Sequence, residues 1–143
     1  DPANPGSVGA QEGAAWNREP GISWLGHVDD IAALWARTHF AVLPSYSEGL
    51  PKSLLEAAAC GRAMMASDVP GCREIVRDGQ TGILVPARDP TALANAIARL
   101  AAAPALRDAY GKAARQLVVE KFSDAAIGKQ TGALYKSLIG AGA

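Results

Sequence analysis

Two glutamates, Glu48 and Glu56, are the side chains of this 143-residue chain whose type and spacing best suit chemistry. They stand eight residues apart, with a Gly-Leu-Pro turn at 49–51 between them. An ionised carboxylate only accepts hydrogen bonds, so it suits the hydroxyls of a sugar or a ribose. The backbone amides of the turn suit phosphates instead. A site with both kinds of group fits a nucleotide sugar.

The residues around this turn predict a strand, a loop and a helix. An apolar run at 40–43 reads as the strand, and a helix is expected at 51–60, with Pro51 at its first helical position and Gly61 just after its end. The first helical N–H groups lack intrahelical partners, and the helix dipole favours phosphate there. Open parallel sheets bind ligands at this carboxyl edge.

Apolar runs and helical periodicity predict the remaining elements. Further strands are expected at 22–25, 63–67 and 83–85. Helices are expected at 7–16, 31–38, 73–77, 90–102, 106–121 and 123–138, with Ser7 as the cap of the first and Asp89 as the cap of the fourth. The alternation predicts an α/β fold, a Rossmann-like parallel sheet with helices on both faces, followed by C-terminal helices. Because a four-stranded parallel sheet is thin, additional strands are expected before residue 1.

Composition excludes several classes of function. The chain has 49% hydrophobic and 20% charged residues, as an ordinary globular domain has. Its 14 basic and 14 acidic residues are intermixed, so we expect no nucleic-acid partner. Two cysteines, Cys60 and Cys72, indicate a cytoplasmic protein rather than a disulfide scaffold. His27 and His39 have no Cys or His at ligand spacing, so no metal is predicted.

The stretch from Glu48 to Glu56 resembles the motif of two glutamates found in family 4 retaining glycosyltransferases of the GT-B fold. Weaker likeness runs from residue 24 to about residue 138 and includes the segments 71–74, 82–85 and 122–123. The resemblance implies that residues 1–143 are a single domain, a truncated C-terminal, donor-binding half of a larger enzyme. The N-terminal acceptor domain, the first strands and a basic diphosphate-binding loop would then lie outside this sequence.

The resemblance also implies roles for particular residues. Glu48 would be catalytic and face the hydroxyls of the donor sugar, while Glu56 would accept hydrogen bonds from the ribose. Phosphate would meet backbone amides of the turn, although Pro51 has no N–H to offer. The donor-binding set implied in this way is Gly49, Leu50, Pro51, Lys52, Ser53 and Glu56, together with His27, Val28 and Asp30, which resemble the loop that lies against the base.

The reaction implied is transfer of a sugar, with retention, from a UDP- or GDP-linked donor to a bacterial surface polysaccharide or a lipid-linked acceptor. It needs no cofactor and no metal. The resemblance further implies a cytoplasmic protein, with peripheral association of the complete enzyme at the inner face of the membrane, and an inactive chain when this part stands alone. Two other functions stay open: a sugar-nucleotide epimerase of GT-B architecture and a non-catalytic Rossmann-like interaction module.

Structural roles also fit the two glutamates. Glu48, or more simply Ser47, is suited to capping the helix that follows the turn. Glu56 stands among leucines and alanines, so we expect it to be buried, where a carboxylate requires a partner.

Overall fold

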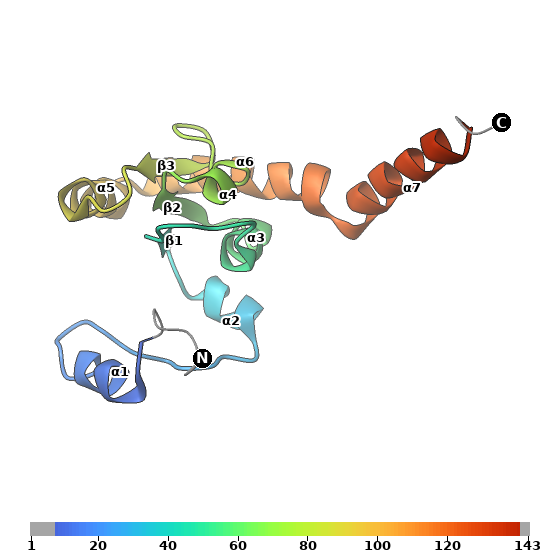
Figure 1. The fold of residues 1–143 in the computed structure, drawn as a ribbon. Coiled ribbons are helices and arrows are strands. Elements are labelled where there is room, and N and C mark those ends of the chain that lie inside the picture. Colours follow the sequence, from blue (N-terminus) through green and yellow to red (C-terminus); the bar gives the residue numbers. More distant parts are fainter. Residues whose placement is uncertain (1–7, 141–143) are drawn as a thin grey trace. The chain divides into compact units, whose positions relative to one another are not determined.

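The computed structural model describes residues 8–140, which form two compact units divided between Ile31 and Ala32. The first unit contains helix α1 (Ala10–Trp16), and helix α2 (Ile31–Ala36) begins at the division. The second unit contains the sheet and the remaining helices (Figure 1). The predicted cap Ser7 lies outside the described residues.

The strand predicted at 22–25 is wrong, because this segment is irregular and pairs with no strand among residues 8–140. Its largest side chain packs on α1 instead. The Trp24 ring meets that of Trp16 edge to face, with 5.6 Å between centroids, and lies where a side chain on Gly13 would be. The side chain of Asn17 holds the Trp24 backbone by accepting a hydrogen bond from its N–H. A strand needs a paired neighbour, and the described residues of this unit provide none.

The second unit is built on a parallel sheet, which confirms the predicted α/β fold. Its strands β1 (Phe40–Leu43), β2 (Ala63–Ser67) and β3 (Gly82–Val85) lie in the order β1-β2-β3. The sheet therefore has three strands among the described residues, not the four predicted. In the register, Met64 lies between Ala41 of β1 and Gly82 of β3.

Five helices surround or follow the sheet in chain order: α3 (Lys52–Ala59), α4 (Pro70–Arg73), α5 (Pro90–Ala102), α6 (Pro104–Phe122) and α7 (Asp124–Gly140). The predicted cap of α5 is confirmed, since Asp89 Oδ1 accepts a hydrogen bond from the Ala92 N–H at 2.8 Å. No helix within residues 8–140 is long and apolar enough to cross a membrane.

The helix predicted at 73–77 is displaced. Pro70 occupies the first turn of α4, where its fixed φ is suited to a helix start, and the helix ends at Arg73. The Thr81 hydroxyl accepts a hydrogen bond from the Arg77 N–H and donates one to the Ile75 carbonyl, at 2.8 and 3.0 Å. These bonds occupy the backbone groups that a helix through 77 would use.

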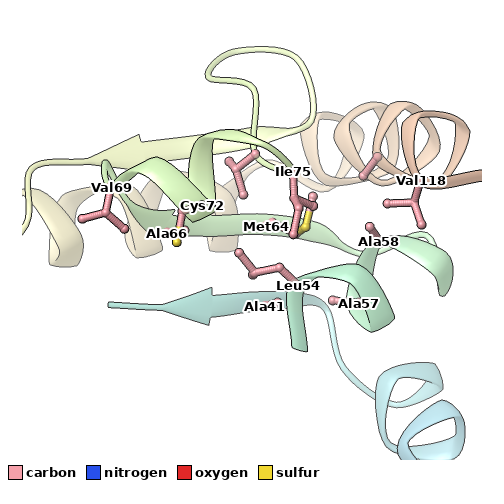
Figure 2. Packing of buried hydrophobic residues seen from close by; sticks show 12 residues of the cluster. Ala41, Leu54, Ala57, Ala58, Met64, Ala66, Val69, Cys72, Ile75 and Val118 are labelled. Carbon is pink, nitrogen blue, oxygen red and sulfur yellow. The ribbon is translucent and has the colours of Figure 1, made fainter. Parts of the chain in front are cut away.

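The core lies on both faces of β2, all five of whose residues are buried. Met64 and Ala66 belong to one hydrophobic cluster, which includes residues of α3, α4 and α6 (Figure 2). Ala63 and Met65 belong to the other, with residues of β3, α5 and α6. Because successive side chains of a strand point to opposite faces, this division shows that helices cover both sides of the sheet.

A close approach of backbones joins α6 to the end of α3. A Cβ on Gly111 would come closer than 3.0 Å to the carbonyl oxygen of Gly61, which follows α3 in the left-handed conformation at φ 67°. Gly111 is buried in α6, so the helix accepts a residue of poor helical propensity in exchange for this contact.

We predict that Gly111→Ala destabilises the protein by ~1–3 kcal/mol, because the added methyl must displace backbone rather than a flexible side chain. Gly128→Ala in α7 is the matched control. A Cβ there meets nothing within 4 Å, so this change should stabilise by up to ~1 kcal/mol. Urea unfolding of the two variants measures the difference, and equal effects of the same sign would contradict the contact.

Candidate functional site

The loop at 44–51 carries the chain from the carboxyl end of β1 to the start of α3, as the sequence predicts. The helix begins one residue later than predicted, so Pro51 is its N-cap rather than its first helical residue. The backbone of Pro51 is extended, at φ −70° and ψ 112°. Its carbonyl accepts the N–H groups of Leu54 and Leu55 and so begins the helix. Proline at this place removes a donor that no intrahelical acceptor could have satisfied.

Four backbone N–H groups at this turn have no acceptor among the described residues. They belong to Gly49, Leu50, Lys52 and Ser53, the four residues predicted to meet phosphate through their amides. Their position at the start of an eight-residue helix adds the favourable field of the helix dipole. The turn can thus donate several hydrogen bonds to one anion.

The capping roles considered for Glu48 and Ser47 are wrong, because no side chain caps α3. Glu48 is half-buried and makes no hydrogen bond or ion pair within residues 8–140. A partly desolvated carboxylate with free acceptor atoms beside free amide donors is suited to a ligand that carries both hydroxyls and phosphate.

Glu56 differs from the prediction, since its side chain is exposed rather than buried. The α3 residues Leu54, Ala57 and Ala58 face the core, so the position of Glu56 falls on the other side of the helix. The Glu56 side chain, like that of Glu48, has no ion-pair or hydrogen-bond partner in the described part of the chain. Lys52 and Ser53 are likewise exposed at the helix start.

Gly71 of α4 fixes the position of the Glu48–Gly49 peptide. A Cβ on Gly71 would lie closer than 3.0 Å to the carbonyl oxygens of Glu48 and Gly49. Only glycine allows the α4 backbone to approach the loop this closely. The start of α4 is tied in turn by a hydrogen bond of 2.5 Å from Arg73 Nε to Asp68 Oδ1, and this bond lowers the pKa of Asp68. The sequence predicts no role for Gly71 in the site; its signal is the Pro-Gly pair at 70–71, shortly after the strand at 63–67.

Cys72 lies beneath the same loop. Its side chain is fully buried, and burial raises the pKa of its thiol. The negative charge of Glu48 raises that pKa further.

The residues predicted to face the base, His27, Val28 and Asp30, belong to the irregular segment before α2 in the first unit. His27 Nε2 lies 3.2 Å from Asp29 Oδ1, and both side chains are exposed. Their role toward a base stays a prediction. Within residues 8–140, no three His, Cys, Asp or Glu side chains are grouped so that they could hold a metal ion.

We predict that Gly71→Ala moves the backbone at Glu48 and Gly49, because the added methyl collides with the carbonyl oxygens of both residues. Backbone amide shifts of Glu48 and Gly49 should change more than those of any residue in α7, at a stability loss of ~1–3 kcal/mol. Gly132→Ala, whose Cβ meets no atom within 4 Å, is the control. Unchanged Glu48 and Gly49 resonances in folded Gly71→Ala protein would show that α4 does not position the loop.

We also predict that Glu48→Gln lowers the pKa of the Cys72 thiol, because a neutral side chain no longer opposes the thiolate. The pKa should stay above that of an exposed cysteine, since burial is the larger cause. The Cβ carbon shift of Cys72, followed by NMR as the pH rises, reports this titration. Glu56→Gln, on the exposed side of α3, should leave the curve unchanged, and a shift as large as that of Glu48→Gln would refute the assignment.

The parallel sheet defines an α/β domain of Rossmann type, and the free amides of the turn lie at the carboxyl edge of β1. The family described as Glycosyl transferases group 1 matches residues 6–103, and the chain belongs to this family. The resemblance to GT-B glycosyltransferases is thereby confirmed.

Individual relatives agree with this membership. The lipopolysaccharide core biosynthesis mannosyltransferase LpcC of Rhizobium leguminosarum bv. viciae is 40% identical over 119 residues, which are 83% of this chain and 34% of the relative. The alpha-maltose-1-phosphate synthase of Mycobacterium tuberculosis is 42% identical over 130 residues, 82% of this chain and 33% of that protein. The chain thus spans about a third of the length of these relatives.

Solved structures show the same fold. The sucrose-phosphate synthase from Thermosynechococcus elongatus superposes with a TM-score of 0.78 at 38% identity, over 84% of this chain and 31% of the other. HepE of Anabaena, solved in complex with UDP, gives a TM-score of 0.79 at 24% identity, over 89% of this chain and 35% of its own.

Proposed function

We propose that this chain is the donor-binding part of a retaining glycosyltransferase, which transfers a sugar from a nucleotide diphosphate. The observation that carries the proposal is the turn itself. Four unpaired backbone amides, from Gly49 to Ser53, lie between two carboxylates that have no partner among the described residues. Such a turn offers donors to a diphosphate and acceptors to sugar and ribose hydroxyls.

In this proposal Glu48 is the residue that meets the donor sugar and Glu56 holds the ribose. The exposure of Glu56 supports its role in ribose binding, because a ribose can reach the Glu56 side chain from solvent without displacing core residues. Catalysis then comes from orientation of the donor and from stabilisation of charge on the leaving diphosphate. The support that Gly71 and α4 give to the loop keeps Glu48 in place for that task.

The similar proteins support sugar transfer over the two other functions, an epimerase and a non-catalytic interaction module. The named activities of the similar proteins include a mannosyltransferase and a glycogen synthase, whereas neither an epimerase nor a non-catalytic module is favoured. HepE has been solved with UDP and with UDP-glucose, which supports a uridine donor over a guanosine donor. We propose UDP as the first nucleotide to test and GDP as the second.

The acceptor of the transferred sugar and the cellular location of the enzyme are also proposals. The lipopolysaccharide-core relative supports a surface polysaccharide or a lipid-linked acceptor, bound by an N-terminal half outside this sequence. Cys60 and Cys72 are both free thiols, which supports a cytoplasmic protein, with the complete enzyme peripherally bound at the inner face of the membrane.

Titration of the isotope-labelled protein with UDP tests this function. Amide signals of Gly49, Leu50, Lys52 and Ser53 should shift first, because their N–H groups donate to the phosphates. Glu56→Gln should weaken binding about ten-fold or more, as loss of a hydrogen bond to a charged group costs roughly 1.5–3 kcal/mol. Glu120→Gln in α6, a carboxylate outside the turn, is the control. Shifts confined to α6 and α7 with both UDP and GDP would overturn the donor site.

A further inference from the structure

A second hollow opens at the same edge of the sheet as the turn. It has a volume of about 480 Å³, within the size range of small-molecule sites. Its walls come from the carboxyl ends of the strands and the chain that follows them: Pro44 and Tyr46 after β1, Ser67 and Val85 at the ends of β2 and β3, and Arg88 and Asp89 before α5. None of its lining residues belongs to the donor set assigned above.

Ser67 gives this pocket a polar group that is not used by the fold. The residue is 2% exposed and lines the cavity. Its hydroxyl makes no hydrogen bond with any described residue. Because Ser67 lines the cavity, its free hydroxyl can donate a hydrogen bond to a ligand bound there or accept one from it.

Tyr46 and Arg88 also line this pocket. The Arg88 guanidinium lies over the Tyr46 ring at 5.0 Å from its centroid, and the Tyr46 side chain is otherwise widely exposed. Arg88 has φ 65°, the one positive φ outside glycine among the described residues. This backbone is costly for arginine, and such strain is concentrated at functional sites.

The charges of the pocket select the class of ligand. Arg88 and Asp89 bring one positive and one negative charge to the same wall. Asp89 uses Oδ1 to cap α5 and keeps its second oxygen as an acceptor. A phosphate would meet repulsion from Asp89, whereas a neutral ring with several hydroxyls can donate to Asp89 and accept from Arg88 and Ser67 while its apolar face covers Tyr46.

We propose that this pocket binds one neutral sugar unit of the acceptor glycan, beyond the part of the acceptor that the N-terminal half holds, beside the donor turn and separate from it. The identification of that sugar as part of an acceptor rests on the proposed function; the pocket itself rests on its own residues. The two sites share one loop, since Tyr46 and the Glu48–Gly49 peptide are separated by a single residue.

NMR titration with methyl α-mannoside and methyl α-glucoside tests the pocket. Amide signals of Tyr46, Ser67 and Arg88 should shift with millimolar affinity. Ser67→Ala should weaken binding about five-fold while the fold is kept, because the hydroxyl it removes has no partner in the protein. Tyr46→Ala should weaken it further, while Tyr135→Ala, an equally exposed tyrosine in α7, should not.

The outcomes separate this proposal from the proposed function. Sugar shifts at Ser67 and Arg88 without any UDP shift at Gly49 would support the pocket and count against the donor site. The proposal is overturned if UDP shifts Gly49 but neither sugar moves the pocket signals, or if Ser67→Ala and Tyr46→Ala bind as wild type. If inorganic phosphate shifts the Arg88 signal more than the sugars do, the pocket is an anion site and the proposal is overturned. Displacement of the bound sugar by UDP would overturn the proposal as well.

Discussion

Burial of β2 on both faces is the constraint on which the second unit depends. All five of its residues are inside, and its neighbours β1 and β3 satisfy its backbone on either edge. A strand buried in this way needs apolar cover above and below, and α3, α4, α5 and α6 supply it through two clusters that take alternate β2 side chains. Because these crossovers return each strand in parallel, the loops after β1, β2 and β3 all reach one edge. Both proposed sites lie at that edge for this reason.

Close backbone contacts then set the details of the edge. Gly71 lets α4 touch the Glu48–Gly49 peptide, and Gly111 lets α6 touch the end of α3. The two contacts support the turn from different sides, one at the loop and one at the far end of the helix that the loop begins. Contacts between backbones are stiff, since no side chain is present to yield by changing rotamer. A turn supported in this way holds its free amides before any ligand arrives, so little ordering remains to oppose binding.

The arrangement is also compatible with two carboxylates beside the phosphate site that we propose. Glu48 is half-buried, with no cation paired to it in the described chain, and its charge adds to the larger effect of burial in raising the pKa of Cys72. Glu56 is about one turn into α3 and exposed. The donors of the turn are therefore not neutralised by either carboxylate, and the two kinds of group can serve different parts of one nucleotide sugar.

The sequence alone determined β1, the central strand, α5 with its Asp89 cap, and the turn between Glu48 and Glu56, because each carries a local signal: a short apolar run, a cap residue before proline, or a turn. Tertiary structure decided the rest. Residues 22–25 are apolar enough for a strand, yet no described neighbour pairs with them, and Trp24 packs on Gly13 instead. Glu56 is exposed because the orientation of α3 is fixed by which of its faces meets β2. Gly71 and the pocket of Tyr46, Ser67 and Arg88 join residues from separate crossovers. The spacing of residues along the chain does not encode these contacts, since they form only when the parallel strands bring their carboxyl ends to one edge of the sheet.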